Sequence, residues 1–192
     1  MFPQNFTNKS QQLLQMAAQI AAQNGQQQVE PPHLFFAMLE DEEGVANSII
    51  SKMGANPITL RASAQSLIDI LPKQASTTAS ITGQVMLGQA MMFVFQAAAS
   101  EAQKMGDEYI SVEHLFLAFL SGSNPINEIL NKENITYDSV LKTLATIRGN
   151  QRVDSPEPET RYNALEKYGK NLTDLARKEK IDPVIGRDDE VR

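Results

Sequence analysis

His33 and His114 are the side chains in this sequence that could most readily perform acid–base or metal chemistry. They are its only histidines, and each opens one of two similar heptapeptides, HLFFAML at 33–39 and HLFLAFL at 114–120. A metal site needs further His, Cys or carboxylate ligands at suitable spacing. Neither histidine has such a ligand arrangement within three or four positions. We therefore expect both to be neutral residues that serve a helix start or pack in the core.

Two short acidic runs, 41–43 and 188–190, are the other candidates for metal binding. Magnesium sites in nucleotide enzymes combine one or two carboxylates with substrate phosphates. No GxxxxGK[ST] phosphate loop accompanies either run, and the chain has no cysteine, no GxSxG and no HExxH. The sequence therefore predicts no catalytic residue and no metal site, and we expect that this chain is not an enzyme.

The two heptapeptides belong to a longer internal duplication. A shift of 81 positions, tightened to 80 after the heptapeptide, keeps register over roughly 55 residues, which marks a true repeat. It superimposes Ala17 on Ala98, Gly25 on Gly106, Ile49 on Ile129 and Lys52 on Lys132. Two copies are too few for an extended solenoid, so we expect a closed pair packed through related faces.

Each copy is predicted to contain four helices. Thr7, Ser111 and Thr136 are typical helix N-caps, and Pro57 and Pro125 suit a first helical turn. One helix is expected over roughly 84–105, which ends at a glycine. No segment alternates apolar and polar residues over strand length. The sequence thus predicts an all-α fold of two pseudo-symmetric four-helix repeats, 1–72 and 84–148, joined by a polar connector at 73–83.

The character of the chain changes after the second copy. Residues 149–161 hold two prolines, several acidic residues and almost no apolar side chains, which predicts a flexible linker. An amphipathic helix is expected at 162–178, with Leu165, Tyr168, Leu172 and Leu175 on one side.

Composition limits the possible partners. The net charge of −6 argues against a nucleic-acid partner, because backbone binding requires a basic surface. No run of eighteen apolar residues and no signal-peptide pattern occur. We expect a cytoplasmic chain with no membrane partner.

One helix of the second copy is apolar on nearly every side. The stretch MLGQAMMFVFQAAA at 86–99 contrasts with the polar SQQLLQMAAQ of the first copy. Helical geometry puts Met91, Phe95 and Ala98 on one face, while Met92 and Phe93 point elsewhere. Such a helix is either central to the core or partly open to a partner, and the sequence leaves both readings open.

The C-terminal segment ALEKYGKNLTDLARKEKIDPVIGRDDEVR at 164–192, taken with the duplicated unit, resembles the ClpB-type disaggregases of the Clp/Hsp100 family of AAA+ chaperones. TNKSQ at 7–11 and RGNQRV at 148–153 fit the same family. The resemblance implies a duplicated N-terminal domain, a linker, and the start of the first nucleotide-binding module at 162–192.

The family resemblance also implies a function and site residues. Its N-terminal domain is thought to bind unfolded polypeptide at an apolar groove with a polar rim. The groove candidates are Met91 and Phe95, from the helix face described above, and the rim residues that the resemblance implies are Thr7, Asp107 and Glu113. Val184 and Ile185 would contact adenine only in the full-length protein, which would use ATP and Mg. We expect no cofactor in this chain.

The implied partners are unfolded or aggregated polypeptides and the Hsp70 chaperone system, with hexamer assembly through modules that this chain lacks. The alternative, from a different class, is a docking domain for adaptor proteins, as in protease-linked Clp ATPases. Such a domain would recognise a folded partner through a defined polar surface.

Overall fold

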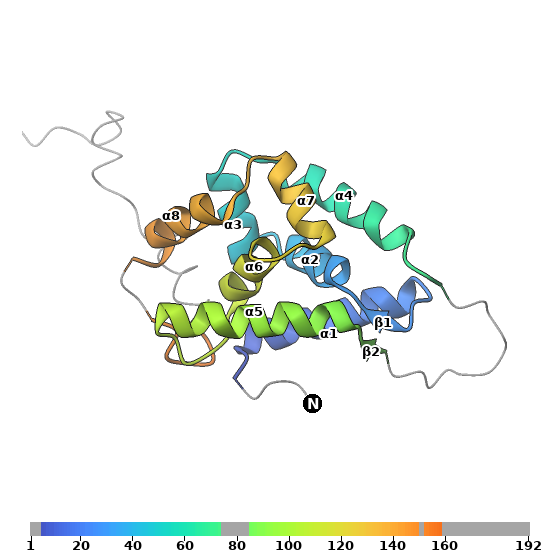
Figure 1. Cartoon of the computed structure of the whole chain (residues 1–192), viewed down its shortest axis with the longest axis horizontal. Coiled ribbons are helices and arrows are strands. Elements are labelled where there is room, and N and C mark those ends of the chain that lie inside the picture. Colours follow the sequence, from blue (N-terminus) through green and yellow to red (C-terminus); the bar gives the residue numbers. More distant parts are fainter. Residues whose placement is uncertain (1–4, 74–84, 150–151, 159–192) are drawn as a thin grey trace, which may run out of the picture.

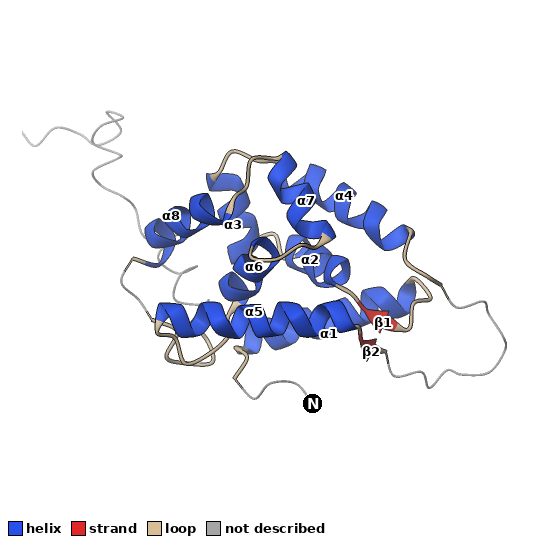
Figure 2. Ribbon diagram, viewed as in Figure 1, coloured by secondary structure: helices blue, strands red, loops and turns tan. Residues whose placement is uncertain are grey.

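The computed structural model describes residues 5–73, 85–149 and 152–158 (Figure 1). The predicted all-α fold is confirmed: eight helices and two two-residue strands make up the described secondary structure (Figure 2). In chain order these elements are α1 (Asn8–Gln23), β1 (Gln28–Val29), α2 (Pro31–Glu40), α3 (Val45–Lys52), α4 (Pro57–Asp69), β2 (Met86–Leu87), α5 (Gln89–Met105), α6 (Val112–Leu120), α7 (Pro125–Lys132) and α8 (Tyr137–Arg148).

The two copies interlock through their third helices. Within a copy, the first helix packs on the second and the second on the fourth: α1 with α2 with α4, and α5 with α6 with α8. Between copies, α3 packs against α6 and α8, as α7 packs against α2 and α4. Each contact therefore has a counterpart under a pseudo-two-fold exchange of the repeats, as expected for two copies packed through related faces.

The repeated heptapeptides form the centre of the core. They become α2 and α6, which lie in the middle of the ribbon in Figure 1. Phe35 and its repeat counterpart Phe116 are both fully buried, with ring centroids 6.3 Å apart. Phe119 stands edge-on to Phe35 at 5.7 Å. Because Phe35 and its repeat equivalent Phe116 contact each other, the pseudo-two-fold axis passes through this aromatic cluster.

Short parallel strand contacts join the two repeats at two places. Gln28 and Val29 of β1 pair with Met86 and Leu87 of β2. The symmetry-related contact is an isolated bridge between Phe6 and Ile110. The prediction that the fifth helix starts near residue 84 is wrong, because the Met86 and Gly88 amides donate to Gln27 and Val29 oxygens at 2.8 and 2.9 Å. Helix α5 therefore begins only at Gln89, after Gly88 as N-cap.

The predicted helix ends are confirmed. Thr7 caps α1 by accepting from the Ser10 amide, Thr136 caps α8 in the same way, and Ser111 is the N-cap of α6. Gly106 ends α5 in the left-handed region, with φ of 71°. These local signals set the starts of α1, α6 and α8 and the end of α5.

The part of the predicted linker that the structure describes is packed on the domain. Val153 is fully buried and its carbonyl accepts from the Glu108 amide at 3.0 Å. In this structure an apolar anchor and backbone hydrogen bonds hold residues 152–158 against the domain, and the flexibility expected for 149–161 stays a prediction. The connector beyond residue 73 and the helix expected at 162–178 lie outside the described residues. The domain boundaries stay predictions.

Candidate functional site

The apolar helix α5 presents two different faces. Met91 and Phe95 are 0% and 3% exposed, and Phe95 stands edge-on to Phe6 at 5.2 Å between ring centroids. Met92 and Phe93, in contrast, are 50% and 62% exposed. Of the two readings that the sequence left open, burial therefore holds for Met91 and Phe95 in this structure, and a role of either residue in substrate binding stays a prediction. Their side chains fill the space between α5 and the start of α1, so partners cannot reach them.

The exposed face of this helix continues into β2. Met86 is 67% exposed and lies six and seven residues before Met92 and Phe93. We call Met86, Met92 and Phe93 the α5 surface. No charged residue occurs anywhere from 85 to 100. Three large exposed apolar side chains within eight residues mark a candidate surface for a partner, and the Glu30 carboxylate lies next to it beside Gly88.

The equivalent face of the first repeat is polar. The shift of 81 that aligns α1 with α5 puts Gln11 and Gln12 at the positions of Met92 and Phe93, and both glutamines are exposed. Folding alone does not require apolar residues there, because the same helical position in the same fold tolerates glutamine. The difference between the repeats therefore points to a role outside the core.

The predicted rim residues are buried. Thr7 and Glu113 are 0% exposed, and so is the side chain of Asp107. Thr7 is engaged as the α1 cap, and its amide donates to the Ile110 carbonyl at 3.0 Å. These three residues lie near the start of α1 and the loop between α5 and α6. They build the interior of this end of the domain and do not form an exposed rim in this conformation.

Asp107 is the centre of a buried charged cluster. Its carboxylate accepts from His114 Nε2 at 2.9 Å, from Arg148 at 2.8 Å and from the Val153 amide at 2.8 Å. Burial alone raises the pKa of the Asp107 carboxyl, but these hydrogen bonds outweigh it and hold the pKa well below its usual range. The carboxylate is therefore ionised and acts as a structural anchor.

Glu113 lies beside this cluster without a hydrogen bond of its own. Both carboxylate oxygens are buried and have no hydrogen-bond partner among the described residues. The Arg148 Nε atom lies 3.8 Å from Oε1. The Arg148 guanidinium thus stabilises two buried carboxylates of the second repeat, those of Asp107 and Glu113.

The two histidines serve helix starts, as expected. The Glu30 amide donates to His33 Nδ1 at 2.9 Å, and the Ser111 amide donates to His114 Nδ1 at 3.0 Å. Because a backbone amide can only donate, each Nδ1 is unprotonated and the proton sits on Nε2. His33 Nε2 then donates to Gln26, as His114 Nε2 donates to Asp107.

Sequence reasoning missed Arg148, although a signal was present. The shift of 80 places Arg148 on Ile68, and Gln26 of the first repeat on Asp107 of the second by the shift of 81. In the first repeat the Gln26 side-chain amide donates to the Ile68 carbonyl at 2.6 Å. The second repeat thus has an arginine where the first has isoleucine and an aspartate where the first has glutamine. Two opposite charges at aligned neutral positions could have indicated an ion pair.

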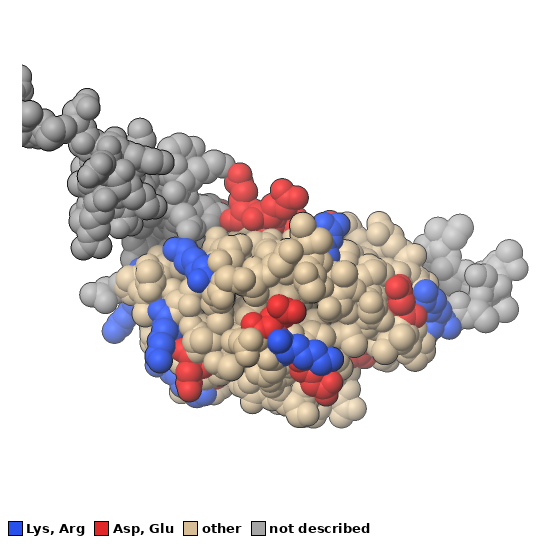
Figure 3. All heavy atoms as spheres, turned by 90° about the horizontal axis from the view of Figure 1, so that it is seen from above, with Lys and Arg blue, Asp and Glu red and all other residues tan. Residues whose placement is uncertain are grey.

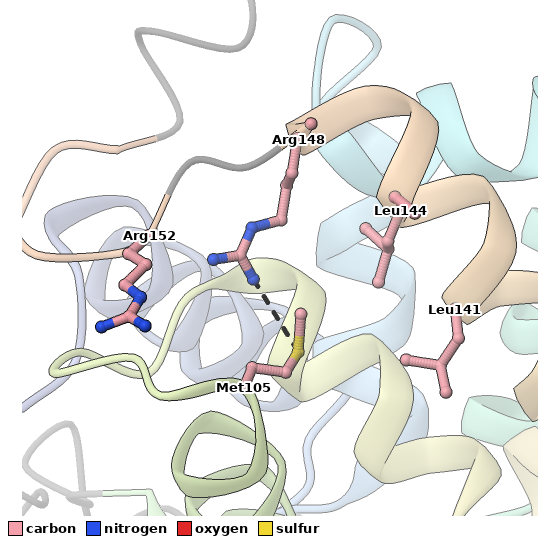
Figure 4. A pocket seen from close by; sticks show the side chains of 7 residues that line it. Met105, Leu141, Leu144, Arg148 and Arg152 are labelled. Atoms are coloured by element: carbon pink, nitrogen blue, oxygen red, sulfur yellow. Dashed lines mark hydrogen bonds between the residues drawn. The ribbon is translucent and has the colours of Figure 1, made fainter.

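A pocket of about 440 Å³ opens beside this cluster, between the C-terminal ends of α5 and α8 (Figure 4). Figure 4 shows Arg148 reaching toward Met105, whose sulfur accepts from the guanidinium at 3.8 Å. The lining residues are Met105, Leu141, Leu144, Ala145, Arg148, Gly149 and Arg152. It lies about 20 Å along α5 from Met92 and Phe93, so it is separate from the α5 surface.

The described residues offer no metal centre or membrane span. Residues 5–73, 85–149 and 152–158 contain no cluster of three His, Cys, Asp or Glu that could hold a metal ion. None of the helices in this part of the chain has the length and apolar character that a membrane crossing needs. On the side that carries α4, α7 and α8, basic and acidic side chains are interspersed (Figure 3). Val184 and Ile185 lie outside the described residues.

Comparison with known proteins identifies the family. The family described as "Clp repeat (R) N-terminal domain" matches residues 5–133. The chain belongs to this family. The Clp N-domain is also 41% identical over 186 residues to the chaperone protein ClpB of Bacillus cereus, and 42% identical over 190 residues to that of Clostridium tetani. These matches cover 97% and 98% of this chain but only 21% and 22% of the relatives.

The chain therefore corresponds to the N-terminal region of ClpB-type chaperones and spans about a fifth of their length. Solved structures agree on the fold. The Hsp104 N-terminal domain of Candida albicans superimposes with a TM-score of 0.69 at 18% identity, over 81% of this chain and 99% of that one. The N-domain of ClpV from Vibrio cholerae gives 0.62 at 13% identity, over 79% and 89%.

Proposed function

We propose that this Clp N-domain receives substrates for an ATP-dependent protein disaggregase, and that it binds exposed apolar segments of unfolded or aggregated polypeptides on the α5 surface. The observation that carries the proposal is the exposure of Met86, Met92 and Phe93 at positions where the first repeat has polar residues. Methionine side chains adapt to irregular partners, which suits a receptor that must accept many sequences.

The chemistry of the α5 surface favours neutral, apolar or aromatic segments. Residues 85–100 carry no charge, and the one acidic group described next to this surface is the Glu30 carboxylate beside Gly88. Three exposed side chains give weak and sequence-tolerant binding. Several domains attached to one assembly would still capture an aggregate, because linked weak sites act together through effective concentration.

The remaining parts of the proposal concern the whole protein. The relatives are named chaperone protein ClpB, and this chain covers about a fifth of their length. ATP and Mg binding, hexamer assembly, cooperation with the Hsp70 system and a cytoplasmic location would all belong to the full-length protein. This chain would contribute recognition and no ATP hydrolysis.

A second candidate function is docking of an adaptor or a defined partner peptide. One structural neighbour, at 14% identity and a TM-score of 0.59, is described as a complex of the ClpV N-domain with a VipB peptide. The pocket beside Arg148 and Arg152 offers such a partner a concave surface in which two arginines stand among mostly apolar side chains. This alternative predicts recognition of one specific sequence, whereas the α5 surface predicts tolerance.

An NMR titration separates these functions. The isotope-labelled chain is titrated with a reduced and chemically blocked protein that cannot refold. Chemical-shift changes at Met86, Met92 and Phe93 support the substrate-receiving function. Changes confined to Leu141 and Arg152 favour the docking alternative, and no change at high polypeptide concentration contradicts the proposed function.

A further inference from the structure

Residues 152–158, which follow α8, are attached to the domain through Val153 and, further along, through Pro156 and Glu157. At the first point, the Val153 side chain is fully buried and its carbonyl accepts from the Glu108 amide. The Val153 amide donates to the Asp107 carboxylate at 2.8 Å. This single residue therefore pairs with successive residues, Asp107 and Glu108, of the loop between α5 and α6.

The second attachment point is the first residue of α1. The Asn8 amide donates to the Pro156 carbonyl at 2.8 Å, and the Asn8 side chain donates to Glu157 Oε1 at 2.9 Å. Pro158 is buried at the end of the segment. The first amides of a helix have no partner within the helix. The segment supplies one of these missing acceptors, so it completes the start of α1.

Most side chains of the segment are exposed. Arg152, Asp154, Pro156 and Glu157 are exposed, and Ser155 is half-buried. Only Val153 and Pro158 contribute buried apolar surface. A segment that buries only two apolar side chains and forms no helix or strand belongs to the part of a protein that opens without global unfolding.

We propose that residues 152–158 form a releasable strap, which docks on Asp107–Tyr109 and Asn8 and shortens the tether between the Clp N-domain and the chain that follows. Seven extended residues span up to about 25 Å. Docking holds that length against the domain, and release adds it to the reach of the tether. The strap lies at the C-terminal end of α5, away from the α5 surface, and does not depend on the proposed function.

The position of Asn8 allows a selective test. Asn8 is the first residue of α1, where proline is tolerated because its missing amide has no helical partner. Thr7 before it has φ −62° and ψ 158°, which a following proline accepts. Asn8→Pro therefore removes the donor to Pro156 while the helix is kept. Gln89→Pro is the matched control, since Gln89 opens α5 and Gly88 before it has φ −68° and ψ 157°.

Amide hydrogen exchange, followed by NMR on the 192-residue chain, measures release directly. In the unmodified chain we expect the Glu108 and Val153 amides to exchange together, faster than the core amide of Leu117 but slower than an unprotected amide. Asn8→Pro and, separately, Val153→Ser should each accelerate both strap amides at least tenfold and leave Leu117 unchanged. Gln89→Pro should leave all three unchanged.

Trypsin cleavage after Arg152, detected by mass spectrometry, gives a second readout that should accelerate in the same two variants. Strap amides that exchange as slowly as Leu117 would overturn the proposal, because the segment would then open only with the whole fold. Exchange at the unprotected rate would overturn it as well, because the strap would not be docked. Unchanged strap exchange in both variants would also contradict it.

Discussion

The first helices of the two repeats share one fold position but differ in what they expose. On α1 the outward positions are Gln11 and Gln12, while on α5 the same positions are Met92 and Phe93. The inward positions differ much less, since Leu13 and Leu14 become Val94 and Phe95, all buried. The inward positions of this helix are apolar in both copies, whereas these two outward positions are apolar only in the second copy.

The polar clusters behind these helices differ in the same way. Gln26, His33 and the Ile68 carbonyl hold the first repeat together with neutral groups. Asp107, His114 and Arg148 make the equivalent contacts with charges. The comparison shows that one geometry can be supported by neutral or by charged hydrogen bonds, and that the charged version makes the second repeat more dependent on a single residue.

The largest expected effect distinguishes the two faces of α5. Phe95→Ala should lower the free energy of unfolding by about 3 to 5 kcal/mol, because it leaves a cavity beside Phe6. Phe93→Ala, two residues earlier, should change it by less than about 0.5 kcal/mol because the ring is exposed. Urea unfolding of both variants checks this. Equal losses would contradict the assignment of faces.

The next largest loss of stability is expected when the positive charge of Arg148 is removed. Arg148→Met leaves Asp107 and Glu113 buried without their cation and should cost about 3 kcal/mol. The control Arg152→Met alters an exposed arginine and should cost less than about 0.5 kcal/mol. Chemical denaturation at pH 7 measures both. A loss for Arg148→Met no greater than the control would show that the charged cluster is dispensable.

The neutral cluster around His33 and the charged cluster around Asp107 should lose stability in different pH ranges. Burial lowers the pKa of His33 in the folded protein, so the unfolded chain binds more protons below pH 6.5 and stability falls as the solution is acidified. The slope from this group is at most about 1.4 kcal/mol per pH unit. The ion pair of Asp107 is lost only at lower pH, below about 4, as its pKa is depressed.

Unfolding free energies at pH 7.0 and 5.5 test this difference. The unmodified chain should lose stability between these values, and His33→Gln should lose less over the same interval. The same loss in both would indicate that other groups, and not His33, dominate the titration in this window.

The smallest effect comes from transferring the apolar exterior to the first repeat. Gln11→Met with Gln12→Phe places the α5 side chains on α1, at exposed positions of the same geometry. A second surface of equal kind should raise the binding of an unfolded polypeptide about twofold. Isothermal titration with the double variant measures this. No gain would mean that the side chains alone are insufficient and that Met86 or the surrounding backbone is needed.

Much of the fold could be predicted because its signals are local or repeated. Thr7, Ser111 and Thr136 correctly predicted helix starts, and the duplicated heptapeptides predicted two related halves of the core. The late start of α5 could not be predicted from local pattern, since it depends on pairing of Met86 and Leu87 with a strand almost sixty residues away.

The candidate site was only partly predictable. Helical geometry separated Met91 and Phe95 from Met92 and Phe93 but could not say which pair faces the core, because a helix that is apolar all round gives no direction. The alignment with the first repeat indicates which face is buried, because Leu14 aligns with Phe95 and the polar Gln12 aligns with Phe93. The burial of Asp107 and Glu113 required knowledge of Arg148, which only the fold brings to them.

The central claim is that the α5 surface is the receptor for unfolded polypeptide, and the double variant Met92→Gln with Phe93→Gln tests it most directly. It gives the second repeat the exterior of the first and leaves the core unchanged. We predict that the Kd for a permanently unfolded polypeptide rises at least tenfold, as expected for loss of an aromatic anchor, while the melting temperature stays the same. An unchanged Kd in the folded variant would contradict the account.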